Sequence, residues 1–145
     1  MNKEKSIIYD DKDHIYTLSG QKLISVTTLL RNAGVYKYYH TGKNAQVYMD
    51  KGTYVHKTIA LYEDGLLDEN NLTDNKPYLN NYKLFKNITG YEPYLTEHIV
   101  WSVQHEFAGT LDSYGILNGE NVIIDFKTGS PNNASGLQLG AYSLA

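Results

Sequence analysis

The chain has 145 residues, of which 41% are apolar and 20% charged, and its net charge is -3. This composition is typical of a globular domain that is long enough to bury a core of its own. The absence of cysteine excludes disulfides, thiolate metal sites and a cysteine nucleophile, and the acidic balance excludes a broadly basic nucleic-acid coat. A metal would therefore be bound by carboxylates, imidazoles or carbonyls, a ligand set that favours Mg2+ or Mn2+.

The N-terminal third predicts a β-hairpin followed by a helix. Ile7 to Tyr9 and His14 to Leu18 are strand-like runs on either side of a polar turn. Ser25 is the expected N-cap of a helix that ends near Gly34. The aromatic and basic segment 36–48 is interpreted as a loop with a short helix.

The middle of the chain predicts two helices joined by a surface loop. The first runs from Asp50 to Glu63, where apolar residues recur at helical spacing. Its expected buried stripe consists of Val55, Ile59 and Tyr62. Residues 64–75 are polar and loop-like, and the second helix covers Tyr78 to Ile88 and is closed by Gly90.

The C-terminal half predicts three strands and a last helix. Strands are expected over Tyr94 to Val103, Glu106 to Leu117 and Val122 to Lys127, with Asn118-Gly119 as a hairpin turn. The helix covers Ala134 to Ala145. Its expected buried stripe is Leu137, Ala141 and Leu144. The order of elements indicates an α/β (or α+β) layered fold with an N-terminal β-hairpin.

Two carboxylates and a lysine are predicted to converge in the last two strands. Asp125 and Lys127 are two residues apart, so in a strand they share a face. Asp112 lies on the neighbouring strand, across the hairpin turn. Burying such charges costs several kcal/mol unless they are paired or bind a metal. Taken alone, Asp-Phe-Lys is more often a solvated salt bridge.

Four more residues are candidates for the same site, each with a plainer alternative. His56 lies in the middle of a helix, where a histidine is more often structural than a ligand. Glu97 is a possible acidic partner or a plain edge charge. Gln138 and Tyr142 are one helical turn apart, and the alternative for them is a polar-aromatic surface pair.

These motifs, in this order, resemble the RecB-type branch of the PD-(D/E)XK nuclease superfamily. The resemblance rests on Gly52-x-x-x-His56, Glu97, Gly109-Thr110-Leu111-Asp112, Asp125-Phe126-Lys127-Thr128-Gly129 and Gln138-x-x-x-Tyr142. Residues 23–30 also resemble the start of phage exonuclease-like members. The resemblance covers residues 14–145. It implies a restriction-endonuclease-like core, in which a mixed β-sheet is flanked by helices.

The resemblance also implies the role of each residue. His56, Asp112, Asp125 and the backbone carbonyl of Phe126 would bind Mg2+ or Mn2+, and Asp112, Asp125 and Lys127 would be catalytic. Lys127 would orient or activate the attacking water and stabilise charge on the phosphate. Two further roles complete the site: DNA contacts by Gln138 and Tyr142, and an accessory acid at Glu97.

The chain is therefore expected to be one nuclease-like domain over residues 1–145. In the family a further strand follows the Gln-Tyr helix, and here the sequence ends at Ala145. A shortened sheet, a fragment, and a strand supplied by a partner are the alternatives. No signal peptide or transmembrane segment is recognised, so the expected location is the cytoplasm of a bacterium or a phage-infected host.

The leading functional hypothesis is a metal-dependent deoxyribonuclease, an exonuclease acting on DNA in phage or bacterial recombination or repair. Its expected partner is DNA, together with a second copy of the chain or a recombination protein. No association with a membrane is expected. The first alternative is a catalytically impaired nuclease-like module that binds DNA or protein. The second is an interaction protein that uses its 14 tyrosines to recognise a protein.

Overall fold

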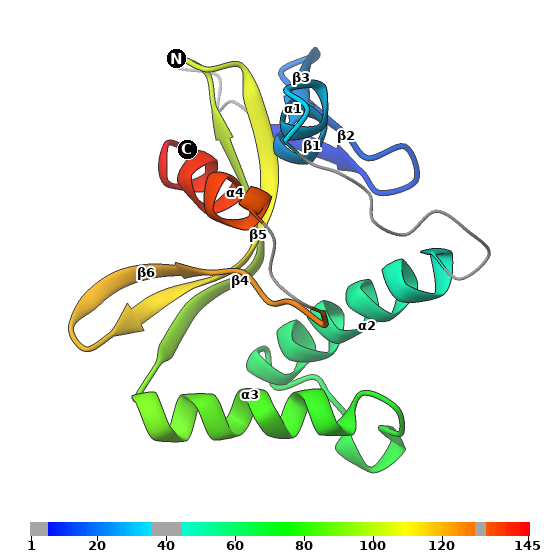
Figure 1. Ribbon diagram of the computed structural model, residues 1–145, viewed down its shortest axis with the longest axis vertical. Helices are drawn as coiled ribbons and strands as arrows, with labels where there is room; N and C mark the ends of the chain where they lie inside the picture. The colour runs from blue at the N-terminus through cyan, green and yellow to red at the C-terminus, as the bar shows by residue number, and fades with distance from the viewer. Residues whose placement is uncertain (1–5, 36–44, 130–132) are drawn as a thin grey trace. The chain divides into compact units, whose positions relative to one another are not determined.

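The computed structural model describes residues 6–35, 45–129 and 133–145 (Figure 1). These residues form two compact units. One contains residues 6–35, 99–110 and 133–145, and the other contains residues 45–98 and 111–129. Both combine helices with strands, which confirms the predicted mixed α/β class. The single-domain organisation over residues 1–145 and the restriction-endonuclease-like core stay predictions.

The strands of the described residues form a mixed sheet. They are β1 (Ile7–Asp10), β2 (Ile15–Leu18), β3 (Gln21–Ser25), β4 (Glu92–Ser102), β5 (Phe107–Leu117) and β6 (Glu120–Ile124). Hydrogen bonding links them in the order β1-β2-β3-β5-β4, and β6 pairs with β5. The pairs β1–β2, β2–β3 and β5–β6 are antiparallel, whereas β3 and β5 are parallel.

The first unit begins with the predicted hairpin, in which Ile7 pairs with Leu18. The predicted helix is also confirmed: α1 (Val26–Asn32) begins after Ser25, whose hydroxyl accepts a hydrogen bond from the Thr28 amide at 3.1 Å. Strand β3 was not predicted. It pairs with β2 across a tight turn at Ser19 and Gly20, whose φ values are 50° and 88°, and with β5, a strand about 80 residues further along the chain. The Ser-Gly pair is a local signal for this turn, whereas the pairing with β5 has no local signal.

Helix α4 (Asn133–Ser143) forms where predicted but buries a different stripe. Leu137 and Leu144 are 52% and 61% exposed, so the predicted stripe through Leu137, Ala141 and Leu144 is wrong. The buried positions are Ala134 and Tyr142, eight residues apart. Gly109 explains the choice: a Cβ there would lie 2.6 Å from the Tyr142 ring, so the missing side chain makes room for tyrosine.

The second unit contains α2 (Ala45–Glu63), α3 (Lys76–Thr89) and the short 3-10 turn η1 (Glu69–Asn71). Val55 and Ile59 of α2 pack against Leu79 and Tyr82 of α3, with Tyr62 beside them, which confirms the predicted stripe. Gly90 ends α3 with a left-handed backbone, φ 68°, as predicted. Helix α2 begins at Ala45, five residues before the predicted Asp50, and the remainder of the predicted loop, 36–44, lies outside the described residues.

The β5–β6 hairpin carries the acidic residues of the predicted site. Asn118 and Gly119 both have positive φ, 53° and 82°, which is the signature of a type I′ turn and confirms the predicted hairpin. Strand β6 ends at Ile124, so the prediction that it continues to Lys127 is wrong. Asp125, Phe126 and Lys127 leave the ladder because their backbone and side chains bind other partners, described below.

Gly115 lies where β5 passes closest to the start of β4. A Cβ at this position would overlap the carbonyl oxygen of Glu92 and lie 2.8 Å from the Cα of Pro93. Both neighbours are backbone atoms, so the clash cannot be relieved by a side-chain rotation. We expect Gly115→Ala to lower the free energy of unfolding by about 3 kcal/mol. Urea denaturation followed by circular dichroism measures this effect.

The matched control is Gly136→Ala in α4, where a Cβ would meet open space. Alanine is the better helix former, so this variant is expected to be neutral or more stable by up to about 1 kcal/mol. Equal stabilities of the two variants would show that the close approach at Gly115 is not a constraint.

Within the part of the chain that the structure describes, no helix has both the length and the apolar character needed to cross a bilayer.

Candidate metal centre

His56 enters the site from the middle of α2. Val55 and Ile59 face the core, which places His56 at the edge of the buried face and leaves it partly exposed. Its Nε2 atom is 2.9 Å from the backbone carbonyl oxygen of Phe126. A carbonyl can only accept, so Nε2 carries the proton of this hydrogen bond. The other ring nitrogen, Nδ1, is the one that faces the carboxylates.

Asp112 is a buried acid on β5. Its side chain is 9% exposed, and it projects from β5, whose neighbouring residues Leu111 and Ser113 are buried as well. Oδ2 accepts a hydrogen bond from the Phe126 amide at 2.6 Å, and Oδ1 lies 3.4 Å from Nδ1 of His56. One oxygen is therefore fixed by the backbone, and the other is directed at the imidazole.

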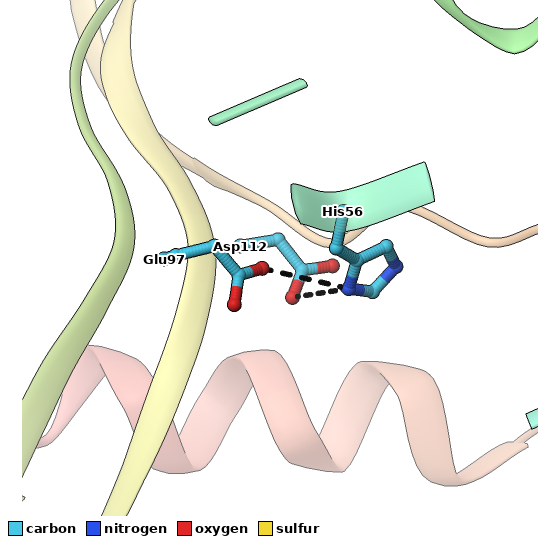
Figure 2. A group of neighbouring side chains, drawn as sticks. All are labelled: His56, Glu97 and Asp112. Atoms are coloured by element: carbon cyan, nitrogen blue, oxygen red, sulfur yellow. Dashed lines mark ion pairs between the residues drawn. The ribbon is translucent and has the colours of Figure 1, made fainter. Parts of the chain in front are cut away.

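Glu97 completes the group from β4. Its Oε1 is 3.6 Å from Nδ1 of His56, so both carboxylates approach the same ring nitrogen (Figure 2). The backbone of Glu97 has φ 46°, a left-handed conformation that is uncommon for a glutamate and rarer still within a strand. Such backbone strain is typical of functional positions, where it directs a side chain to a particular place. The sequence alone treated Glu97 as an accessory group, and no local pattern marks this turn of the backbone.

Asp125 and Lys127 form an ion pair with each other. Lys127 Nζ lies 2.8 Å from Oδ1 and 2.7 Å from Oδ2 of Asp125, a contact with both carboxylate oxygens. The Asp125 side chain is only 5% exposed, whereas that of Lys127 is 34% exposed. The predicted closeness of these two charges is therefore present, although it arises beyond the end of β6 and not on one strand face.

Electrostatics distinguish Asp112 and Glu97 from ordinary surface acids. Burial raises the pKa of Asp112, and the negative charge of Asp125 raises it further, against the opposing effects of His56, the Phe126 amide and Lys127. Burial also raises the pKa of Glu97, with His56 opposing and Asp112 adding to the shift. Both carboxylates are thus costly to ionise in this place unless a further positive charge joins them.

The arrangement fits a divalent cation. One ligand atom from each of His56, Glu97 and Asp112 lies within 4.8 Å of the others. Nδ1 faces the carboxylate oxygens at 3.4 and 3.6 Å, which is too long for strong hydrogen bonds. Ligand atoms about 2.1 Å from a metal are roughly 3.0–3.4 Å apart in octahedral or tetrahedral sites. The separations of these atoms are therefore close to those of ligands that share one metal ion.

Two members of the predicted ligand set have partners of their own in the structure. The Phe126 carbonyl, expected to bind the metal, accepts the hydrogen bond from His56. Asp125, expected to be a ligand, is engaged by Lys127. Metal binding by the Phe126 carbonyl and by the Asp125 carboxylate stays a prediction. Glu97 is the third residue of the group whose possible ligand atoms converge.

Gln138 and Tyr142 belong to the first unit, whereas the acidic group belongs to the second. They contact each other, with Gln138 Nε2 donating to the Tyr142 hydroxyl at 3.0 Å. Tyr142 is 5% exposed because its ring packs against Gly109. In this conformation the ring is not available to stack on a base, so its contribution to the first unit is packing. The predicted DNA contact of these two residues stays a prediction.

Glu97 offers a direct test of the three-residue group. We expect Glu97→Gln to weaken Mn2+ binding by about tenfold or more, because the variant keeps the size of the side chain and loses its charge. Isothermal titration calorimetry measures this affinity. Glu120→Gln, an exposed position on β6, is the control that removes the same charge elsewhere in the unit. Identical Mn2+ affinities in the two variants would remove Glu97 from the ligand set.

Comparison of the chain with models of protein families, with curated proteins and with solved structures finds no match. The residues that bear on function are therefore those of this site, His56, Glu97 and Asp112 with Asp125 and Lys127.

Proposed function

We propose that this protein is a divalent-metal-dependent deoxyribonuclease, with Mg2+ or Mn2+ bound at His56, Glu97 and Asp112. The observation that carries the proposal is the convergence of one imidazole and two carboxylates, whose ligand atoms lie within 4.8 Å of one another, beside a third acid, Asp125, and its lysine. The PD-(D/E)XK resemblance of these same residues supplies the reaction. An exonuclease role in phage or bacterial recombination or repair rests on that resemblance alone.

Hydrolysis of a phosphodiester needs an ionised water and a means to stabilise the negative charge that grows on the phosphate. A bound divalent metal supplies both at neutral pH. Asp112 and Glu97 contribute the negative charge that holds such an ion, and His56 contributes a neutral nitrogen ligand. An imidazole among the ligands favours Mn2+ over Mg2+, because Mg2+ prefers an all-oxygen set.

Lys127 has the chemistry required next to the reacting phosphate. Its side chain is a third exposed, and its ammonium group is held by a nearly buried carboxylate, so the lysine is fixed in place at a partly exposed position. In the proposed reaction it donates hydrogen bonds to a phosphate oxygen or to the attacking water. Asp125 holds the lysine near Asp112, whose pKa responds to both charges.

The alternative, a nuclease-like module that binds DNA or protein without cutting, keeps one observation in its favour. Lys127 is paired with Asp125 at both oxygens, and a lysine that stays in this pair does not reach a phosphate. The two functions give opposite results in a cleavage assay, so they are separated by the experiment below.

The test is incubation of the protein with end-labelled linear DNA in Mn2+, in Mg2+ and in EDTA. The proposal predicts shortening of the DNA with Mn2+, a slower reaction with Mg2+ and none with EDTA. His56→Gln is the matched variant, because it removes the nitrogen ligand without changing the net charge of neutral histidine. Intact DNA under all conditions, together with DNA binding in Ca2+, would favour the non-cutting alternative. Cleavage by His56→Gln at the parental rate would place the activity elsewhere.

A further inference from the structure

The backbone of Phe126 contacts two of the three proposed ligands. Its N–H donates to Oδ2 of Asp112 at 2.6 Å, and its C=O accepts from Nε2 of His56 at 2.9 Å. The backbone of one residue therefore holds side chains that come from a helix and from a strand far apart in the sequence. Each side chain keeps its other polar atom, Oδ1 or Nδ1, for the point where the group converges.

The ring of Phe126 fixes the backbone of this residue in place. Strand β6 ends at Ile124, so no strand ladder positions residue 126. Its ring instead packs against the core of α2 and α3, with an edge contact to Tyr82 at 5.4 Å and an interplanar angle of 79°. A second edge contact joins it to the His56 ring at 6.2 Å. The side chain thus anchors to the same helices that carry and support His56.

We propose that Phe126 is a positioning residue that selects Nδ1 of His56 as the metal-binding atom. The carbonyl keeps the proton of a neutral imidazole on Nε2, which leaves the Nδ1 lone pair directed toward Asp112 and Glu97. Hydrogen bonds of this kind set the tautomer and the ring orientation of metal-binding histidines. The inference rests on the proposed metal site, and it assigns the Phe126 carbonyl to the histidine.

The tautomer can be measured directly, before any metal is added. In 15N-labelled protein, a long-range 1H–15N correlation spectrum distinguishes the protonated from the unprotonated nitrogen of a neutral imidazole. The chain has five histidines, and the His56→Gln variant identifies the His56 signals. We expect Nε2 to be protonated and Nδ1 to be unprotonated. The opposite tautomer would overturn the proposal.

Addition of 113Cd2+ then identifies the ligand atom, because the metal couples to the nitrogen that it binds. The proposal predicts coupling at Nδ1, and coupling at Nε2 would overturn it. A protein that has the expected tautomer and binds no 113Cd2+ would support the positioning role of Phe126 and contradict the proposed metal site. The failure of one claim is therefore distinguishable from the failure of the other.

Variants of Phe126 test the anchor. Phe126→Ala is expected to weaken 113Cd2+ binding roughly 10–100-fold, because the backbone of residue 126 is no longer fixed. Both neutral tautomers of His56 are then expected to be populated. Phe126→Leu restores an apolar anchor and is expected to recover most of the affinity. The control is Phe85→Ala, which removes a ring packed on the same core cluster. It is expected to lower stability and leave the His56 tautomer unchanged. Equal tautomer populations and affinities in Phe126→Ala and Phe85→Ala would overturn the proposal.

Discussion

Asp112→Asn is expected to lower the affinity for Mn2+ by more than about a hundredfold and to abolish DNA cleavage. Asparagine has nearly the same shape, and its carbonyl oxygen still accepts the hydrogen bond of the Phe126 amide, so the fold around it is retained. What it loses is the buried negative charge that faces His56. Calorimetric titration with Mn2+ and the end-label assay measure the two effects.

The same variant has a predicted effect on stability without metal. Burial raises the pKa of Asp112 in the folded state. Protonated Asp112 stabilises the folded state fully at pH values below the pKa of an aspartate in the unfolded chain, about 3.9. This stabilisation is lost as the pH rises through the higher pKa of Asp112 in the folded state. Metal-free Asp112→Asn should therefore lose less stability than the parent between acid and neutral pH.

Asp74→Asn, in the exposed turn before α3, is the control for removing one charge from the same unit. It should keep the parental Mn2+ affinity and the parental dependence of stability on pH. If Asp112→Asn also kept the parental Mn2+ affinity and the parental dependence of stability on pH, Asp112 would be neither a ligand nor a costly buried charge.

Lys127→Met is expected to reduce cleavage by about a hundredfold or more while Mn2+ binding is retained or strengthened. Lysine is assigned to the phosphate or the water, so its loss removes an interaction of the transition state. Removal of a positive charge from the ion pair with Asp125 also reduces repulsion of a cation. Single-turnover cleavage separates the chemical step from DNA binding.

Lys57→Met provides the comparison, because Lys57 acts on Glu97 through its charge and lies on the exposed side of α2. We expect this variant to cut DNA at close to the parental rate. Parental cleavage by Lys127→Met would leave Lys127 as a salt-bridge partner only, and another group would have to activate the water.

Local sequence signals predicted the elements whose boundaries depend on local chemistry. Ser25 caps α1, Gly90 ends α3 with a positive φ, and Asn118-Gly119 forms the turn of the β5–β6 hairpin. Each of these residues acts through its own side-chain oxygen or its own backbone freedom. For this reason they can be recognised without knowledge of the fold.

Most of the failed predictions depend on partners that are distant in the sequence. Strand β3 pairs with its neighbour β2 and also with β5, about 80 residues further along the chain. The buried face of α4 depends on the space that Gly109 leaves for Tyr142. Strand β6 stops at Ile124, before the segment in which the backbone of Phe126 binds His56 and Asp112. Periodicity alone does not contain these contacts.

The candidate site was predicted in part for the same reason. Motif spacing identified His56 and Asp112, which the structure brings together. It gave Glu97 a lesser role than its geometry supports, because the left-handed turn at Glu97 is a property of the folded strand. The hydrogen bond between the Phe126 carbonyl and His56 joins a loop to a helix, and motif spacing contains no sign of it.

The most direct test of the metal centre is an anomalous difference map from crystals of this protein grown with Mn2+. The site described above predicts a peak about 2.0–2.6 Å from Nδ1 of His56 and from carboxylate oxygens of Glu97 and Asp112. A map with no peak among these three side chains, or with the ion bound to Nε2 of His56 and away from Glu97, would contradict it.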